Sequence, residues 1–262
     1  MSLDLTQSGQ VDVSSLGDGP CYVYGVTHSG LDPTALAAVE GMGAHGPALL
    51  EQGRVAAVVE VLDNPSALGT RQDLLAHYRV LDAIAAEGVV LPMRFGSVLT
   101  DAEAAQAELL EPHHDEFVAS LAALEGHAQL ILRARYVQDV VLGEVVAENP
   151  AIEELRARTR ALSEDASYYD RIRLGELVAQ AVDAKRETDR ELVLEALRGH
   201  VVDWSVREAS GIDTLVEVSL LVADSQQVAL EEAAGAVARS MADRATFELV
   251  GPMAPYDFVP EG

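Results

Sequence analysis

Three glycines near the N-terminus have the spacing of a phosphate-binding loop. Gly41, Gly43 and Gly46 satisfy G-x-G-x-x-G, a pattern that lets the backbone approach a pyrophosphate at a helix N-terminus in dinucleotide-binding units. Such a site needs a strand before the glycines and a helix after them. Here the helix-like run LAAVE precedes them, and Pro47 leads into a strand-like segment. We therefore interpret residues 41–46 as a flexible loop and predict no cofactor.

The densest group of potential metal ligands is the run EPHHDE. In it, His113 and His114 stand among Glu111, Asp115 and Glu116, residue types that coordinate zinc and other divalent metals. Neighbouring histidines on a helix point about 100° apart, and neither HExxH nor a second ligand cluster accompanies them. We interpret the run as the solvated start of a helix and predict no metal site.

Side chains suited to nucleophilic catalysis are scattered along the chain. Cys21 is the single cysteine and lies in an apolar run, where we expect it to pack and not to react. The remaining histidines are far apart, and no G-x-S-x-G motif links one of them to a serine. Because no spacing assembles a pocket of convergent titratable groups, we predict a non-enzymatic protein.

Local patterns in the first half predict a small mixed sheet with helices. Short β-branched and aromatic runs bounded by turn residues predict strands, and PALLEQGRVAAVV predicts a hairpin. Thr70 is a candidate N-cap for a helix that stops at Gly88, and a second helical region from Asp101 is interrupted at Pro112. The predicted strands are CYVYGV (21–26), RVAAVVEVL (54–62) and VVLPMRF (89–95), and the hairpin adds a further strand before its turn at Gln52-Gly53.

The second half has the element order of a ferredoxin-like domain. AQLILRARY alternates in the way expected of a strand with one buried face. A long helical stretch follows, with a new helix starting at Asn149-Pro150; two alternating strands, an amphipathic helix and the strand ATFELV complete the half. This βαββαβ order, with an enlarged first crossover, predicts helices on one face of a sheet whose other face stays open.

We therefore predict an α+β protein with two domains. Residues 1–19 are polar and rich in Gly and Ser without periodicity, which is typical of a flexible leader. The predicted N-terminal α+β domain covers 20–126 and the modified ferredoxin-like domain covers 127–251. Residues 252–262 are predicted to form a C-terminal tail.

Three arginines occupy outward positions of the predicted C-terminal sheet. Arg133 and Arg135 lie in one predicted strand and Arg207 lies in another, in a chain with few cations. Two interpretations remain open: the arginines pair with carboxylates of the long crossover or of the other domain, or they bind a partner protein. RNA binding is not indicated, because the strands offer no aromatic pair of the kind that stacks on bases.

Composition limits the partners and the compartment. With 43 acidic and 18 basic residues, the net charge of -25 repels nucleic-acid phosphates and anionic lipid surfaces. A single cysteine cannot form an internal disulfide, and neither a signal peptide nor a run of about 18 apolar residues is present. We expect a cytoplasmic protein that binds neither nucleic acid nor membrane. The acidity serves either solubility alone or the solubility of an aggregation-prone partner.

Four segments spread over the chain carry a family signature. They are CYVYGV at 21–26, LPMRFGSVL at 91–99, IRLGELVAQAV at 172–182 and FELVGPMAPYDFV at 247–259. Together they resemble the gas vesicle F/L accessory proteins, the GvpF/GvpL family, over nearly the whole chain after the leader. Met253 and Ala254 stand where relatives often have an aromatic residue and a proline.

This resemblance implies a non-enzymatic accessory or minor structural protein associated with gas vesicles. The partners it implies are the hydrophobic major gas vesicle shell protein and other gas vesicle accessory proteins, bound during assembly. Carried over from the matching motifs, the candidate contact residues are Arg94, Phe95, Tyr256 and Phe258. The alternative for the tail is structural: prolines stiffen it, and its aromatic residues clamp it over a domain junction. The alternative function is a ligand-sensing or regulatory ferredoxin-like module.

Overall fold

The computed structural model describes residues 16–17, 19–65, 68–163, 165–208, 211 and 213–259. Most of the predicted leader and the end of the predicted tail lie outside these ranges. The chain forms two compact units. One comprises the described residues up to Gln129 together with those from Pro252 onward, and the other is Leu130–Gly251.

The first unit is built around an antiparallel sheet. Its strands, within the described residues, are β1 (Cys21–His28), β2 (Ala48–Gln52), β3 (Val55–Val61), β4 (Val90–Pro92) and β5 (Val98–Leu99). They are ordered β2-β3-β1-β4, and β5 also pairs with β1. The predicted hairpin is present as β2 and β3, joined through Gly53 at a φ of 61°. The strand predicted at 89–95 is wrong in extent: it ends at Pro92, which lacks an N–H, and Gly96 at a φ of 91° turns the chain.

Two longer helices, α2 (Arg71–Glu87) and α4 (Glu111–Leu124), belong to this unit. The predicted cap is confirmed, because the Asp73 N–H donates to the Thr70 hydroxyl and the Asp73 carboxylate accepts from the Thr70 N–H. The predicted interruption at Pro112 is not a break. A π-helical segment, η3 (Ala105–Leu110), runs directly into α4. Its wider turn accommodates the ring of Pro112, a residue that has no N–H to donate to the preceding turn. The shorter elements are α1 (Thr34–Ala37), α3 (Ala102–Ala104) and η6 (Tyr256–Phe258).

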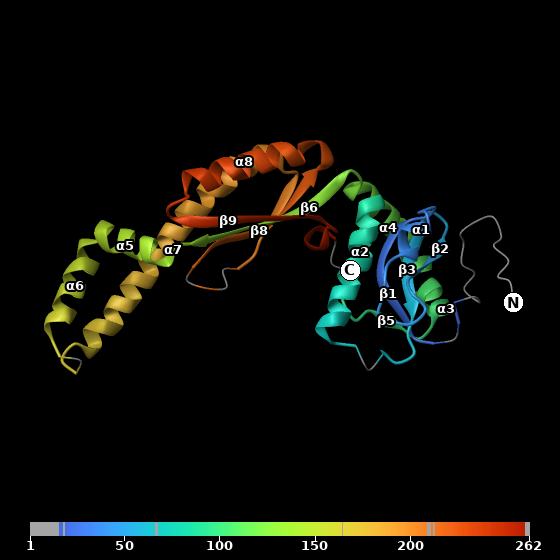
Figure 1. The fold of residues 1–262 in the computed structure, drawn as a ribbon, viewed down its shortest axis with the longest axis horizontal. Helices are drawn as coiled ribbons and strands as arrows, with labels where there is room; N and C mark the ends of the chain where they lie inside the picture. Colours follow the sequence, from blue (N-terminus) through green and yellow to red (C-terminus); the bar gives the residue numbers. More distant parts are fainter. Residues whose placement is uncertain are drawn as a thin grey trace. The chain divides into compact units, whose positions relative to one another are not determined.

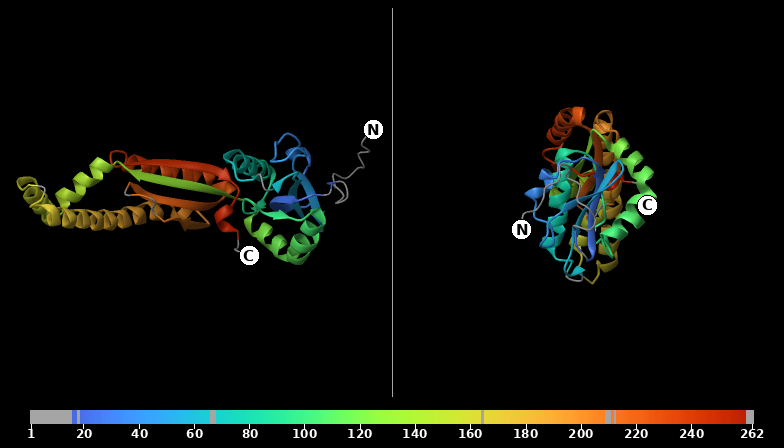
Figure 2. Two further views of the ribbon diagram at one scale, coloured as in Figure 1. Left: turned by 90° about the horizontal axis from the view of Figure 1, so that it is seen from below. Right: turned by 90° about the vertical axis from the view of Figure 1, so that its right-hand side faces the viewer.

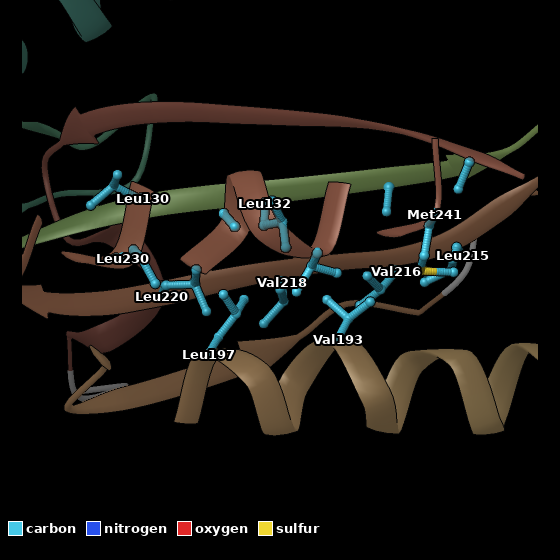
Figure 3. Close-up of a cluster of buried hydrophobic side chains, with 14 of the residues drawn as sticks. Leu130, Leu132, Val193, Leu197, Leu215, Val216, Val218, Leu220, Leu230 and Met241 are labelled. Atoms are coloured by element: carbon cyan, nitrogen blue, oxygen red, sulfur yellow. The ribbon is translucent and has the colours of Figure 1, made fainter. Parts of the chain in front are cut away.

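The second unit contains an antiparallel sheet with helices packed on it (Figure 1). Its strands are β6 (His127–Tyr136), β7 (Asp203–Val206), β8 (Thr214–Ala223) and β9 (Ala245–Met253), in the order β7-β8-β6-β9. Alternate residues of β6 and β8, such as Leu132 and Val218, form its core with Val193 and Leu197 of α7 (Tyr168–Leu197) and Leu230 of α8 (Gln227–Ser240) (Figure 3). The period-two pattern of the sequence therefore identified the buried face of these strands correctly.

The long crossover between β6 and β7 is a helical arm with its own small core. It consists of α5 (Gln138–Glu148), α6 (Pro150–Ala161) and α7, and α6 starts at Pro150 as predicted. Figures 1 and 2 show α6 lying alongside the first half of α7. Val145, Ile152 and Val182 are buried between the three helices. None of the described helices is both long and apolar enough to cross a bilayer.

A charged network fastens this arm to the sheet of the same unit. Arg244 donates from Nε to Glu144 Oε1 (2.7 Å) and from Nη2 to Asp189 Oδ2 (2.8 Å). The same Asp189 oxygen accepts from the Tyr136 hydroxyl (2.8 Å), and Lys185 Nζ lies 3.0 Å from Glu144 Oε2. Asp189 is nearly buried, so its charge depends on these donors for stabilisation. Two short 3-10 helices also lie in the described part of this unit, η4 (Arg198–His200) and η5 (Asp224–Gln226).

Candidate partner-binding surfaces

The glycine motif surrounds a buried carboxylate. Glu60 on β3 is fully buried, and its Oε1 accepts hydrogen bonds from the N–H groups of Gly43 (2.9 Å) and Gly46 (3.0 Å). Its Oε2 accepts from the Met42 N–H (2.9 Å) and the Tyr24 hydroxyl (2.5 Å). The loop that we interpreted as flexible is therefore fastened to the sheet. An internal carboxylate takes the place that a phosphate would occupy in a phosphate-binding loop.

The run EPHHDE lies in the first turns of α4, and its two histidines make separate contacts. His113 Nδ1 is 3.1 Å from Glu116 Oε2. His114 Nε2 accepts from the Arg54 N–H (3.2 Å), while its Nδ1 is 2.9 Å from Asp115 Oδ1. Within the part of the chain that the structure describes, no three His, Cys, Asp or Glu side chains group in a way that could hold a metal ion.

A buried aromatic cluster joins β1, α2 and the turn after β4. Tyr22 Oη lies 2.9 Å from His77 Nδ1 and accepts from the Gly96 N–H (3.2 Å). The Phe95 ring centre is 6.4 Å from that of Tyr22 and 5.7 Å from that of His77. Burial lowers the pKa of His77 to about 4, so this imidazole is neutral at pH 7. Phe95, a predicted contact residue, thus packs within the cluster and is half-buried.

Burial also determines the reactivity of the single thiol, that of Cys21. Cys21 at the start of β1 has no exposed surface, and desolvation, with a smaller contribution from the charge of Asp101, raises its pKa to about 11. A thiol with so little thiolate at neutral pH is a poor nucleophile and a poor metal ligand. Its side chain contributes to packing.

The C-terminal segment packs on the first unit. Ala254 is fully buried in that unit's core, and the Tyr256 ring centre lies 5.4 Å from that of Tyr78 on α2. Asp257 accepts from the Gln129 side-chain amide (2.7 Å), and its N–H donates to Gln129 Oε1 (3.0 Å). Tyr256 therefore holds the segment against α2, whereas Phe258 is half-buried beyond it. The contacts of Tyr256 are those expected of a structural clamp.

An apolar groove of about 290 Å³ lies beside the end of β4. Met93 follows β4, Phe117 lies on α4 and Val259 follows η6, so three separate segments supply its lining. Two of the family-like sequence segments meet here, since Met93 belongs to one and Val259 to the other. Arg94, the next residue after Met93, is exposed in the turn that leads to Ser97. The full lining is Leu91, Pro92, Met93, Leu109, His113, Glu116, Phe117, Ser120 and Val259.

The three arginines of the C-terminal sheet lie close to carboxylates of the same sheet. Arg133 is 3.7 Å from Glu217 on β8 and 3.6 Å from Glu248 on β9. Arg207 reaches the same Glu217 oxygen at 3.4 Å, and the third, Arg135, is 3.0 Å from an oxygen of Asp213. These partners come from neighbouring strands and the adjoining turn, and not from the long crossover or the other domain, which were the sources named in the pairing interpretation. Cross-strand neighbours decide these pairs, because side chains on one face of paired strands lie close together.

Sequence reasoning missed most of the groove. Met93 lies in the segment LPMRFGSVL, of which only Arg94 and Phe95 are predicted contact residues, and Phe117 lies in the helical region after Pro112, for which the sequence predicts no contact role. Their meeting depends on how α4 packs beside β4, which neither local pattern encodes. The one available signal was the presence of Met93 and Val259 in two segments that resemble the same family.

Comparison with known proteins decides the family. The model of the family described as "Gas vesicle synthesis protein GvpL/GvpF" matches residues 20–260. This chain belongs to the GvpL/GvpF family. A gas vesicle protein F from a Streptomyces species is 33% identical over 245 residues, which cover 91% of this chain and 98% of that protein. Gas vesicle protein F of Dolichospermum flosaquae is 21% identical, over 73% of this chain and 78% of its own length. The predicted resemblance is thereby confirmed.

Solved structures of the family share the fold. The crystal structure of gas vesicle protein GvpF from an Anabaena species superposes with a TM-score of 0.80 at 16% identity, covering 94% of this chain and 100% of that one. The GvpF structure from Microcystis aeruginosa gives a TM-score of 0.76 at 17% identity, with 92% and 99% coverage. The predicted α+β class is confirmed, and the protein has two antiparallel sheets.

Proposed function

We propose that this GvpL/GvpF family member is a non-enzymatic accessory protein that binds the hydrophobic major shell protein during gas vesicle assembly. The observation that carries the proposal is the apolar groove beside β4, in a chain with a net charge of -25. An apolar anchor of the shell protein would fill the groove and lose contact with water. The net negative charge of the chain would keep the complex from associating with further copies.

The chemistry of the lining supports an apolar anchor over a polar ligand. Leu91, Met93, Leu109, Phe117 and Val259 supply aliphatic and aromatic surface. Methionine and phenylalanine adapt to side chains of different shape, which suits a groove that receives protein segments. The polar lining includes His113 and Glu116, which already contact one another. The groove therefore offers few polar groups for a charged metabolite.

The arginine surface of the second unit is a proposed site for other gas vesicle accessory proteins. Arg133, Arg135 and Arg207 sit among Glu217, Glu248 and Asp213 at distances of 3.0 to 3.7 Å. Half-exposed pairs of this kind contribute little to stability, roughly 0–1 kcal/mol each. Charged side chains of a partner could therefore replace these carboxylates as the ion-pair partners of the arginines at a small cost in free energy. The structural interpretation, in which these pairs only stabilise the sheet, predicts no change in binding when they are reversed.

We further infer that the second unit is a modified ferredoxin-like domain. Its elements follow the order strand, helices, strand, strand, helix, strand, and β6 and β8 are the central strands of its sheet. That order and arrangement support a βαββαβ domain whose first crossover has been enlarged into the helical arm. The arm leaves the strand order unchanged, because it is inserted between β6 and β7.

The experiment that tests the groove is recovery of the shell protein with the tagged full chain after co-expression. Phe117→Ser and Met93→Ser should each lower recovery about tenfold or more, as expected when a buried apolar anchor contact is lost. The matched control is Val228→Ser, the same kind of change at a residue of α8 that is 68% exposed. Wild-type recovery with both groove variants would overturn the assignment. Thermal unfolding of each variant shows that the fold is intact.

A ligand-sensing module is the second candidate function. A depression of about 310 Å³ between α8 and the sheet, lined partly by Glu231, Phe247 and Leu249, is the observation that favours it. Native mass spectrometry of the purified full chain separates the two candidates. A bound metabolite together with no recovery of shell protein would support ligand sensing and refute the main proposal. Shell-protein recovery without a bound small molecule would support assembly.

A further inference from the structure

The end of the α6–α7 hairpin exposes apolar side chains. Tyr168, Tyr169 and Ile172, in the first turns of α7, are 59%, 83% and 46% exposed, and Leu162 after α6 is 44% exposed. We refer to Tyr168, Tyr169 and Ile172 as the hairpin patch; the ring centres of the two tyrosines are 5.4 Å apart. Large apolar side chains gathered at one place on a soluble surface indicate an interaction site. Tyrosine is enriched at such sites because it combines a rigid apolar ring with a polar tip.

Helical geometry places cations on both sides of the patch. With about 100° per residue, Tyr168, Ile172 and Tyr169 fall within one sector of about 100° on α7. Arg171 and Arg173 lie about 60° and 40° beyond the two edges of that sector, so they flank it. Both arginines are exposed.

The nearby Asp170 is held mainly by α6, while Arg173 makes a smaller electrostatic contribution to it. It points to the inner side of the hairpin, where Arg158 of α6 holds it through two hydrogen bonds of 2.8 and 2.7 Å. The same bonds link the ends of the two helices. Below them, Ile152 and Val182 are buried between the helices. The patch is therefore presented in a preformed geometry, which lowers the entropic cost of binding.

The local charge is opposite to that of the chain. Residues 156–173 contain five arginines and three acidic residues, whereas the whole chain contains 18 basic and 43 acidic residues. Within the part of the chain that the structure describes, Arg156 and Arg160 form no salt bridge. Apolar residues bordered by cations suit a partner segment that has apolar side chains bordered by carboxylates.

We propose that the hairpin patch binds a short acidic segment of a partner protein, at a surface separate from the groove. Apolar side chains of the segment contact Tyr168, Tyr169 and Ile172, and its carboxylates pair with Arg171 and Arg173. The net charge of -25 favours a short segment over a second copy of this chain, a nucleic acid or an anionic membrane, because repulsion grows with the charge of the partner. The inference rests on the proposed function only in that the protein acts by binding other proteins.

The test is site-specific photo-crosslinking in cells that form gas vesicles. The full chain carries Tyr169→p-benzoylphenylalanine, and the control carries Val228→p-benzoylphenylalanine at the exposed site on α8. Mass spectrometry identifies the crosslinked peptide. We expect position 169 to give a protein peptide that is net negative and contains apolar residues. Adding Arg171→Glu and Arg173→Glu should lower the yield about fivefold, the effect of losing two exposed ion pairs.

Several results would overturn the proposal. The first is a crosslinking yield at position 169 that is no higher than the yield at position 228. The second is a crosslink to a basic or uncharged peptide, to nucleic acid, to lipid or to this chain itself. The third is a crosslinking yield at position 169 that does not change when the two arginines are reversed in charge. Shell-protein recovery is measured with the same arginine variants. Unchanged recovery supports a separate surface, and lost recovery refutes it. Failure of the hairpin proposal is thereby distinguishable from failure of the groove proposal, which depends on Met93 and Phe117.

Discussion

Replacing Glu60 by glutamine tests whether the glycine loop is held by a buried carboxylate. The two oxygens of Glu60 accept four hydrogen bonds, three from loop N–H groups and one from Tyr24. Glutamine has the same shape but keeps one acceptor oxygen, and its NH2 group would face two of the four donors. A buried donor left without an acceptor costs about 1–3 kcal/mol. We therefore expect Glu60→Gln to lower the free energy of unfolding of the first unit by about 2–5 kcal/mol.

Urea denaturation followed by far-UV circular dichroism measures this loss. Trp204, the single tryptophan, lies in the second unit, so its fluorescence follows that unit separately. The matched control is Glu87→Gln at the exposed end of α2, for which we expect a change within about 0.5 kcal/mol. Gly41→Ala should behave like Glu60→Gln, because a Cβ at position 41 would overlap the Glu60 carboxylate. A Glu60→Gln midpoint equal to that of Glu87→Gln would refute the reasoning.

Three further predictions concern buried groups and the helical arm. His77 has a pKa of about 4 in the fold against an ordinary value of 6.5, so the unfolded chain binds its proton first as the pH falls. The stability associated with neutral His77 should fall by about 3 kcal/mol between pH 6.5 and 4, and His77→Gln should flatten the measured slope; equal slopes would contradict the assignment. Arg244→Gln leaves Asp189 with fewer donors and should cost about 2–3 kcal/mol in urea denaturation, and a cost under about 0.5 would show that the network is not stabilising. Gly175 lies in α7, and a Cβ added there would meet open space. Gly175→Ala should therefore stabilise the second unit by about 0.5–1 kcal/mol, measured by thermal unfolding. Destabilisation would mean that this face of the helix is not open.

Local patterns of the sequence were sufficient for most elements. The alternation in AQLILRARY identified the buried face of β6, and Thr70 marked the start of α2 through its capping residues. Predictions were weaker where a proline lay inside an otherwise regular strand or helix pattern. The strand expected at 89–95 stops at Pro92, and the helix expected to be interrupted at Pro112 continues through a π-helical segment.

Function-related side chains were harder to place from the sequence. Phe95 and Tyr256 were candidates for partner contact, but both pack against aromatic rings of the first unit. Motif membership marked the right segments without separating residues that stabilise the fold from residues that line a surface. That distinction depends on burial, which a motif does not contain.

The sequence by itself determined the family, the α+β class and the alternating faces of the strands, since each of these depends on residue types at short spacing. Only the tertiary structure decided the role of the glycine loop. Glu60, on the separate strand β3, places its carboxylate inside the loop and accepts hydrogen bonds from the N–H groups of Gly43 and Gly46. The tertiary structure also decided which carboxylates face Arg133 and that Met93 and Phe117 share one groove. Such contacts depend on which elements become neighbours after packing, and residue spacing along the chain does not fix those neighbours.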